Sequence, residues 1–343
     1  MSKHQFSMRK YYTALAMQHP PRLSFAAAKM DFNHWQPLAR QKLLELLGPF
    51  PEKVPLAAEQ EEPVQCEGYT RIRVVFDSEE HMSVPCILLV PECASKKAPV
   101  PAILCSHGHG NFGKEPVAGI ALTQRHLDDI RDMNYDYARQ MAQAGFVTLV
   151  PDLRGFGERG QDIGMVPGHD ACDMDYVKGT LLGISPLAGN IWDMMCCIDF
   201  LETLPYVDGT RIGMMGLSQG GTMTAFTTAV EPRIKAADII GYVNPFLGFG
   251  FERGNFCGSQ VVPGLYQWLD THDIAGLIAP RPLLMEMGRN DKCFFFEDLY
   301  KGFERTREIY LEAGAQDRLY SDVHEGPHAF GGNKAFEFFK MWL

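Results

Sequence analysis

The sequence has no C-x-x-C pair among its nine cysteines, which argues against a zinc site with the usual close spacing of ligands. It has no run of about 18 apolar residues, the length that a membrane-spanning helix needs. Basic residues are in the minority, with 32 Lys and Arg against 42 Asp and Glu, and the formal charge of −10 disfavours a nucleic-acid partner. The first residues lack the apolar region of a secretory signal peptide. We therefore expect a cytoplasmic protein with scattered reduced thiols and no nucleic-acid or membrane partner.

What is present is the composition of an ordinary globular protein, with 46% hydrophobic and 22% charged residues in a chain of 343. That length suffices for one large domain with an extension. Residues 1–62 are the expected helical extension, because 31–48 shows helical apolar spacing that ends at Gly48 and a Pro- and Glu-rich connector follows. The main domain is expected to span 63–343. The extension would either cap the functional site or form a contact in a homo-oligomer.

From residue 69 onward the apolar period changes from that of a helix to that of strands. Residues 70–76 and 82–92 predict an antiparallel hairpin. Beyond it strands and helices alternate, which predicts an α/β fold: a mostly parallel, doubly wound sheet with helices on both faces and ligands at the carboxyl ends of the strands. The expected strands are 101–107, 146–152, 211–216, 234–243, 281–288 and 318–324, and the expected helices are 135–145, 192–204, 222–230, 297–314 and 333–343.

The segment "RIGMMGLSQGGTMTAF" places Ser218 between an expected strand and an expected helix, in a G-x-S-x-G pattern. A serine at so sharp a turn has a strained backbone, and side chains two positions before and after it would clash. Gly216 and Gly220 occupy those two positions. The following helix directs free N–H groups toward the hydroxyl, where negative charge would develop. The pattern predicts that Ser218 is a nucleophile, and the alternative is a structural turn of small residues.

A serine nucleophile needs a histidine base and a carboxylate that orients the base, and in this topology both follow the serine, acid first. Asp291 comes directly after strand 281–288, at the same edge of the sheet as Ser218. His328 lies on the loop before the last helix and is the expected base, whereas His324 ends a strand and remains the alternative. The acids that fit this order less well are Asp298, Asp317 and Asp322.

The loop after the first strand of the alternation contains Gly108, Gly110 and Gly113 in a G-x-G-x-x-G pattern, which is typical of dinucleotide binding. That fingerprint also requires an immediate helix and an acid about 20 residues further on. Pro116 and a long irregular stretch follow instead, and the next acid at a strand end is Asp152. Nucleotide binding is therefore not expected.

We expect the same loop to supply half of an oxyanion hole, formed by the backbone N–H groups of His109 and Gln219. His107 is then a structural histidine, because a metal pair with His109 has no evident third ligand. Asp152 and Arg154 follow a neighbouring strand, and a salt-bridged staple of the loop fits them better than contact with a substrate.

Five segments carry a resemblance to the α/β-hydrolase superfamily: "SHGHGNFG", "PDLRGFGERG", "VDGTRIGMMGLSQGGTMT", "IAPRPLLMEMGRNDKCF" and "HEGPHAF". Within it the chain resembles the acetyl xylan esterase-like and dienelactone hydrolase-like bacterial branch, from about residue 69 to the end. The resemblance implies the α/β-hydrolase fold and an ester-hydrolysing activity. Known xylan deacetylases tend to carry an "RGQG" turn where this chain has "RGFG" at 154–157.

These residues predict a serine carboxylesterase in which Ser218, Asp291 and His328 act on a small ester through an acyl-enzyme, with no cofactor or metal. Two connections over the strand ends, 160–190 and 244–270, would set specificity, and neither contains a large amphipathic lid, so short acyl chains are expected. The alternatives are a prolyl-oligopeptidase-like serine peptidase, which usually has a large additional N-terminal domain, a dienelactone-type lactone hydrolase, and a non-catalytic binding protein. The aromatic residues that could line a substrate pocket, or merely pack under the loop, are Phe246, Phe249, Phe256, Tyr266 and Trp268.

Overall fold

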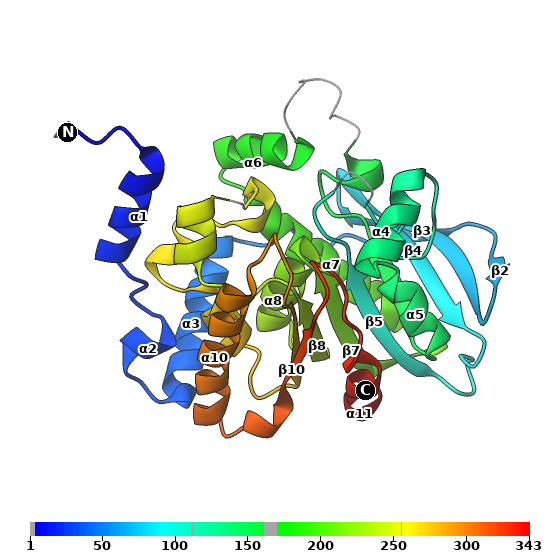
Figure 1. The fold of residues 1–343 in the computed structure, drawn as a ribbon. Helices are drawn as coiled ribbons and strands as arrows, with labels where there is room; N and C mark the ends of the chain where they lie inside the picture. Colours follow the sequence, from blue (N-terminus) through cyan, green and yellow to red (C-terminus); the bar gives the residue numbers. More distant parts are fainter. Residues whose placement is uncertain (1–3, 111–112, 161–169, 255) are drawn as a thin grey trace.

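The computed structural model describes residues 4–110, 113–160, 170–254 and 256–343. Its strands form one sheet in the order β1-β3-β4-β6-β5-β7-β8-β9-β10, with β2 also paired to β3 (Figure 1). The strands are β1 Glu59–Gln60, β2 Val64–Cys66, β3 Tyr69–Glu79, β4 Met82–Pro91, β5 Val100–Ser106, β6 Val147–Pro151, β7 Val207–Leu217, β8 Ile234–Ile240, β9 Leu283–Gly288 and β10 Leu319–His324.

The pairing of the strands is that of the predicted fold. Strands β3 and β4 form the antiparallel hairpin, and β4 runs antiparallel to β6. From β6 through β5, β7, β8 and β9 to β10, every neighbouring pair is parallel. The prediction of an α/β-hydrolase fold with a leading hairpin is confirmed. Strand β1 lies inside the predicted connector and is short, exposed and polar, as suits a sheet edge that must not pair with other chains.

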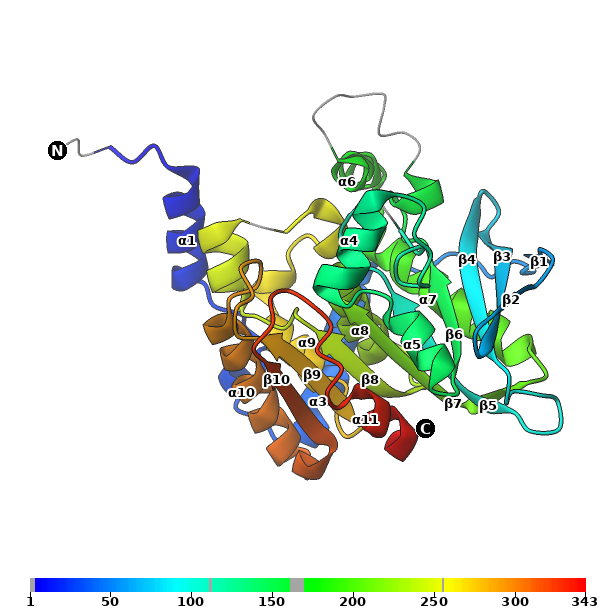
Figure 2. The same ribbon diagram turned by 45° about the vertical axis from the view of Figure 1, so that its right-hand side comes forward.

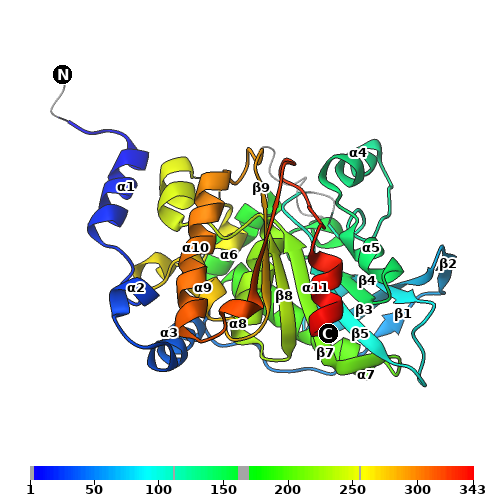
Figure 3. The same cartoon turned by 60° about the horizontal axis from the view of Figure 1, so that its bottom comes forward.

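Helices cover both faces of the sheet, because successive strand side chains point to opposite faces. Leu104 and Met214 belong to the larger apolar cluster, with α3, α7, α8, α9 and α10. Cys105 and Met215 belong to the second cluster, with α5 and α11. Figure 3 shows helices α10 and α11 lying apart from each other along the sheet. The helices are α1 Met8–Gln18, α2 Phe25–Ala28, α3 Phe32–Leu47, α4 Gln124–Met133, α5 Tyr137–Gln143, α6 Ala171–Leu182, α7 Pro186–Thr203, α8 Gln219–Val230, α9 Thr271–Gly276, α10 Phe296–Glu312 and α11 Ala335–Trp342.

Helix α3, at the end of the predicted extension, is part of the main core. Trp35 and Leu43 are fully buried in the larger cluster. The Arg40 guanidinium donates hydrogen bonds to the carbonyl oxygens of Ala229 and Leu277, both 2.9 Å away. These bonds satisfy carbonyl groups near the ends of α8 and α9 and tie the extension to the sheet layer.

Helix α1 lies further out, at the side of the molecule (Figure 1). It packs against the π-helical segment Leu247–Arg253, where the Thr13 hydroxyl donates to the carbonyl oxygen of Phe251. The domain boundary at residue 62, and a role of the extension as a cap or an oligomer contact, stay predictions.

The sequence did not indicate helices α4 and α6. Helix α4 occupies the stretch after Pro116 that we expected to be irregular, and α6 lies in the connection 160–190, of which 161–169 fall outside the described residues. Both helices lie at the end of the molecule where the parallel strands finish (Figure 2). Leu181 and Leu182 of α6 are 83% and 76% exposed, so this helix has no buried apolar stripe for a periodicity argument to detect.

Within the described ranges, no single helix is long and apolar enough to cross a bilayer. Helices α6 and α7 pass that test together by length and composition, but they meet at a bend of 100°.

Candidate active site

Ser218 lies at the turn between β7 and α8, with φ 63° and ψ −117°. A positive φ is strained for a residue that carries a side chain, and it persists only where neighbouring structure holds it. The Ser218 N–H donates to the carbonyl oxygen of Ile240 in β8 at 2.9 Å. Because Ser218 is the N-cap residue of α8, the free N–H groups of the first helical turn lie next to it. This is the backbone of a nucleophile elbow.

The glycines around Ser218 are required by close backbone contacts. A Cβ atom on Gly216 would lie 2.6 Å from the carbonyl oxygen of Ser106 and from the carbonyl group of Gly220. A Cβ atom on Gly220 would overlap the same Ser106 oxygen, and one on Gly221 would lie 2.7 Å from Cβ of Tyr242. Side chains at these positions would push α8 away from the sheet and change the turn that holds Ser218.

The loops after β9 and β10 bring Asp291 and His328 together. The distance from His328 Nδ1 to Asp291 Oδ2 is 2.7 Å. The other carboxylate oxygen, Oδ1, accepts backbone hydrogen bonds from Cys293 at 2.7 Å and Phe294 at 2.8 Å. The Asp291 side chain is 1% exposed and fixed on both oxygens. It therefore selects the tautomer of His328 that carries its proton on Nδ1 and leaves Nε2 free to accept one.

The His328 ring lies beside the elbow. It stacks on Phe294, with ring centroids 5.3 Å apart, and a Cβ atom on Gly241 would lie 3.1 Å from its Cε1 atom. Gly241 directly follows Ile240, whose carbonyl group holds the Ser218 N–H. His328 Nε2 is buried and has no hydrogen-bond partner among the described residues. Such a nitrogen can take a proton from a nearby hydroxyl.

His324, the alternative base, is engaged in its own turn. Its Nδ1 accepts the N–H of Gly326 at 3.1 Å, and burial lowers the pKa of its imidazole. Of the alternative acids, Asp298 forms an ion pair with Arg253 at 3.1 Å, and Asp317 is exposed. Among the described residues at the ends of the parallel strands, Asp291 and His328 form the hydrogen bond between a carboxylate and a histidine.

The loop after β5 lies against the elbow on the opposite side. A Cβ atom on Gly108 would lie 3.3 Å from Cβ of Ser218. The Gly108 N–H donates to the Tyr135 hydroxyl at 2.5 Å, so this N–H is already used. The His109 N–H on this loop and the Gln219 N–H at the start of α8 remain the predicted oxyanion donors, and that role stays a prediction.

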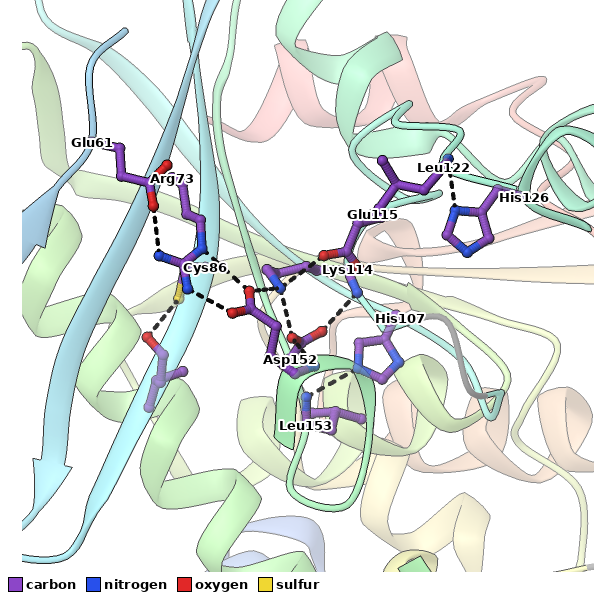
Figure 4. Close-up of polar contacts among 12 residues, drawn as sticks. Glu61, Arg73, Cys86, His107, Lys114, Glu115, Leu122, His126, Asp152 and Leu153 are labelled. Atoms are coloured by element: carbon purple, nitrogen blue, oxygen red, sulfur yellow. Dashed lines mark hydrogen bonds and ion pairs between the residues drawn. The ribbon is translucent and has the colours of Figure 1, made fainter. Parts of the chain in front are cut away.

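His107 is fully buried and serves the fold of this loop. Its Nδ1 lies 2.8 Å from the Gly108 carbonyl oxygen, and its Nε2 accepts the Leu153 N–H at 3.0 Å (Figure 4). Because a carbonyl can only accept and an N–H can only donate, the imidazole must be neutral with its proton on Nδ1. Burial lowers its pKa, which favours the same neutral form. These contacts agree with the predicted structural role.

Lys114 is the centre of a buried ion cluster behind the loop (Figure 4). Its Nζ lies 2.7 Å from Asp152, 2.6 Å from Glu158 and 3.0 Å from Glu115. Burial by itself would lower the pKa of Lys114, but the carboxylates of Asp152 and Glu158 outweigh it and raise the pKa. Burial likewise opposes ionisation of Glu158, yet hydrogen bonds from Arg73 and Lys114 lower its pKa to about 2.

Arg154 belongs to a second ion cluster. Its Nη2 lies 2.7 Å from Asp193 and 2.5 Å from Glu79, and Arg159 lies 2.8 Å from Asp193. Burial would raise the pKa of Asp193, but Arg159 and Arg154 lower it to about 2. The predicted salt-bridged staple is thus two clusters, in which Asp152 and Arg154 have different partners.

The loop that carries the predicted base rests on buried carboxyl groups. Glu286 in β9 accepts the N–H groups of Gly331 at 2.7 Å and Gly332 at 3.3 Å. Asp322 of β10 stands opposite Glu286 in the sheet register. Burial, and then the Asp322 charge, raise the pKa of Glu286 to about 8, and burial also raises the pKa of Asp238 in β8. These shifts favour the protonated forms of Glu286 and Asp238.

A cluster of three potential metal-ligand atoms lies above the elbow: those of His109, Cys172 and Cys257, all within 4.8 Å of one another. His109 Nε2 lies 3.4 Å from Cys172 Sγ, and Cys257 Sγ lies 2.8 Å from the hydroxyl of Ser259. Hydrogen bonds from Cys172, His109 and Ser259 lower the pKa of Cys257 to about 5. The sequence does not indicate this cluster, because its members come from three segments with no common spacing, although His109 itself is a candidate oxyanion donor.

Three of the predicted pocket residues line a cavity of about 1200 Å³: Phe246, Phe256 and Tyr266. The opposite wall is part of the N-terminal segment, from Leu15 to Ala27. Ser218 is not among the described residues that line this cavity.

The other two predicted pocket residues have different surroundings. Phe249 is buried and stacks on Phe294 with ring centroids 4.2 Å apart. Phe294 in turn stacks on the imidazole of His328. Trp268 is covered by the cations of Arg22 and Lys42, 3.9 and 4.3 Å from its ring centroid. A contact of any of the five aromatic residues with substrate stays a prediction.

Comparison with known proteins places this geometry in a family. A model of the Abhydrolase family matches residues 7–305. The chain is 26% identical over 316 residues to "Putative hydrolase YtaP" of Bacillus subtilis (strain 168), which covers 89% of this chain and 98% of that protein. It is 29% identical over 173 residues to "Uncharacterized protein YcjY" of Escherichia coli (strain K12), which covers 50% of this chain and 44% of that one.

Solved structures share the fold at low sequence identity. A "putative acetyl xylan esterase" from Bacteroides fragilis NCTC 9343 matches with a TM-score of 0.77 and 20% identity, over 94% of this chain and 83% of that one. A glucuronoyl esterase from Solibacter usitatus matches with a TM-score of 0.66 and 15% identity, over 94% and 96% of the two chains. The sheet order, the elbow and the family match over most of the sequence lead to one conclusion: the chain belongs to the Abhydrolase family.

Proposed function

We propose that this protein is a serine carboxylesterase that hydrolyses small esters with short acyl groups. The observation that carries the proposal is the hydrogen bond from His328 to Asp291 beside the strained Ser218. Each of the three side chains follows a different strand of the parallel sheet, and this shared edge supports their proposed roles as nucleophile, base and orienting acid. Two similar structures, the "putative acetyl xylan esterase" and the glucuronoyl esterase, support an ester as the substrate class.

The proposed reaction begins with attack by Ser218. His328 Nε2 takes the proton from the Ser218 hydroxyl as its oxygen attacks the ester carbonyl carbon. The tetrahedral oxyanion accepts hydrogen bonds from the N–H groups of Gln219 and His109. The intermediate collapses, His328 gives the proton to the leaving alcohol, and the acyl group remains on Ser218.

Hydrolysis of the acyl-enzyme repeats the same steps with water. His328 takes a proton from a water molecule that attacks the acyl carbon, and then returns that proton to the Ser218 oxygen as the carboxylic acid leaves. Asp291 keeps the imidazole in the required tautomer and stabilises its cation in each half-reaction. The Phe294 ring stacks on both His328 and Phe249, and this aromatic packing behind the base supports the proposal of short acyl groups.

The proposal is tested with p-nitrophenyl acetate, butyrate and octanoate, together with a prolyl p-nitroanilide. We expect turnover of acetate and butyrate that exceeds turnover of octanoate, and loss of this turnover in Ser218→Ala. The matched control is Ser83→Ala, an exposed serine of the β3–β4 hairpin, which should keep full activity.

Two results would contradict the proposal. Ester hydrolysis that survives in Ser218→Ala would show that Ser218 is not the nucleophile and that the turn has only a structural role. Faster cleavage of the prolyl amide than of the acetate ester would favour a serine peptidase of the prolyl-oligopeptidase kind.

A further inference from the structure

The cluster of His109, Cys172 and Cys257 combines one imidazole and two thiols. His109 lies on the loop after β5, Cys172 in the first turn of α6, and Cys257 in the connection between β8 and α9. Three segments that are remote in sequence therefore direct one imidazole nitrogen and two sulfur atoms to the same point. The burial of these residues decreases from Cys172, which is buried, to His109, which is exposed, so the point can be reached from solvent.

The spacing of the donor atoms suits a tetrahedral metal ion. A Zn²⁺ ion with Zn–S bonds of about 2.3 Å and a Zn–N bond of about 2.0 Å holds neighbouring donor atoms about 3.5 to 3.8 Å apart. His109 Nε2 and Cys172 Sγ are 3.4 Å apart, and the three atoms lie within 4.8 Å of one another. A contraction of about 1 Å, which rotation of the exposed His109 ring and of the thiols can supply, would complete the geometry.

The donor types select the metal. Thiolate and imidazole ligands suit zinc and other soft or borderline ions, whereas Mg²⁺ and Ca²⁺ require oxygen ligands. We propose that His109, Cys172 and Cys257 bind one Zn²⁺ ion, with a fourth position open to water.

Neighbouring polar groups would support this site. The Ser259 hydroxyl lies 2.8 Å from Cys257 Sγ and accepts a hydrogen bond from the Gln219 side chain at 2.9 Å. Outer partners of this kind orient metal ligands. The zinc ion would thereby hold in place both segments that carry the proposed oxyanion donors, His109 directly and Gln219 through Ser259. That consequence rests on the proposed esterase function, whereas zinc binding itself does not.

The experiment is a metal titration of the full chain, stripped with a chelator and kept reduced with a phosphine. We expect one Zn²⁺ per chain by competition with a chromophoric chelator. Co²⁺ in its place should give the thiolate charge-transfer and tetrahedral ligand-field absorption of a site with sulfur ligands. Cys172→Ser, Cys257→Ser and His109→Ala should each lose stoichiometric Zn²⁺ binding.

The controls separate the site from other thiols and from the esterase proposal. Cys93→Ser removes an exposed cysteine elsewhere on the surface and should bind Zn²⁺ as the wild type does. Ser218→Ala should also keep the ion, so loss of esterase activity and loss of zinc are independent results. Because His109 is exposed, His109→Ala tests the site even where a cysteine variant fails to fold.

Zinc binding below one tenth of an equivalent in the reduced wild type would overturn the proposal. Binding that persists unchanged in both His109→Ala and Cys257→Ser would also overturn it, because the ion would then lie elsewhere. A Cys172–Cys257 disulfide that forms in air and abolishes zinc uptake until it is reduced would support the proximity of the two thiols and the site.

Discussion

Carboxyl groups lie on both sides of the elbow, and their pKa values are shifted in opposite directions. On the side of β9 and β10, Glu286 has a pKa raised to about 8, and within the described residues it forms no ion pair. On the side of β5 and β6, Glu158 and Asp193 have pKa values lowered to about 2.

The difference is made by neighbouring cations rather than by burial. Burial removes hydration from a carboxylate and favours its neutral form, which is what happens to Glu286 between Asp238 and Asp322. Lys114 and Arg154 reverse this preference on the other side, because each lies within hydrogen-bond distance of its carboxylates. The loop at Gly331 and Gly332 is therefore held by a carboxyl group that favours its neutral form. On the other side, Lys114 and Arg154 hold their loops through ion pairs with carboxylates.

Asp291 departs from both patterns, because backbone N–H groups and a histidine hold it rather than a Lys or an Arg. In Asp291→Asn the amide can keep the backbone bonds but places an NH₂ group against His328, which favours the wrong tautomer. We expect kcat for a short ester to fall by about 10⁴-fold. Steady-state kinetics checks this, with Asp317→Asn, an exposed acid, as the control of unchanged activity. A loss below about tenfold would remove Asp291 from the proposed triad.

Lys114→Met removes the cation at the centre of the ion cluster with Asp152 and Glu158. The substitution leaves the Asp152 carboxylate, which is 0% exposed, without its cation. Removal of one partner of a buried pair destabilises a protein by about 3–5 kcal/mol, because the other charge stays buried. Urea denaturation measures the free energy of unfolding. Lys340→Met, which removes an exposed pair with Glu337, should change it by less than about 1 kcal/mol, and equal effects of the two variants would refute this account.

Glu286→Gln tests whether the raised pKa of Glu286 makes the stability of the protein depend on pH. The unfolded chain releases the Glu286 proton near pH 4.5, whereas the folded protein keeps it to about pH 8. Between these values the folded state binds more protons, so this group makes the wild type less stable as pH rises. Glutamine keeps an acceptor for Gly331 and Gly332 but does not titrate.

We therefore expect Glu286→Gln to gain stability relative to the wild type from pH 5 to pH 8, by at most about 1.4 kcal/mol per pH unit. Thermal unfolding of both proteins in matched buffers gives the comparison. Parallel profiles over this range would show that Glu286 has the same pKa in the folded and unfolded states.

Tyr135→Phe tests a neutral contact on the side of β5. It removes the hydroxyl that accepts the buried Gly108 N–H. An unsatisfied buried donor costs about 1–3 kcal/mol, so we expect a loss near the lower end, measured by urea denaturation. Tyr300→Phe, at an exposed tyrosine of α10, is the control. A loss in Tyr135→Phe as large as that in Lys114→Met would mean that the neutral bond, not the ion cluster, fixes this loop.

Much of the parallel half of the sheet could be predicted from the sequence, because the buried parts of strands such as β5, β7 and β9 are mainly apolar and end at or next to Ser or Gly. Their order along the chain also predicted that Asp291 and His328 would meet, since carboxyl ends of parallel strands share one edge. Helix α6 could not be found in this way, because Leu181 and Leu182 point outward. The segment β1 was read as connector because its two residues are polar and exposed.

The partners of buried charges were beyond sequence reasoning. Arg154 was expected to staple the loop, but nothing in the sequence indicates that its carboxylate partners are Glu79 and Asp193, on β3 and α7. Cys172 and His109 are 63 residues apart and share no spacing motif. The absence of a C-x-x-C pair argues only against ligands that lie close together in sequence, and this cluster has none.

The sequence by itself determined the fold, the elbow and the order of serine, acid and histidine, because apolar period, glycine placement and strand order are local or topological properties. Only the tertiary structure decided the charge state of each buried carboxyl and the meeting of one imidazole with two thiols. Both depend on which side chains approach within a few ångströms after the chain has folded. Coulombic and coordination energies fall steeply as such distances grow, and a sequence pattern does not indicate which side chains will come this close.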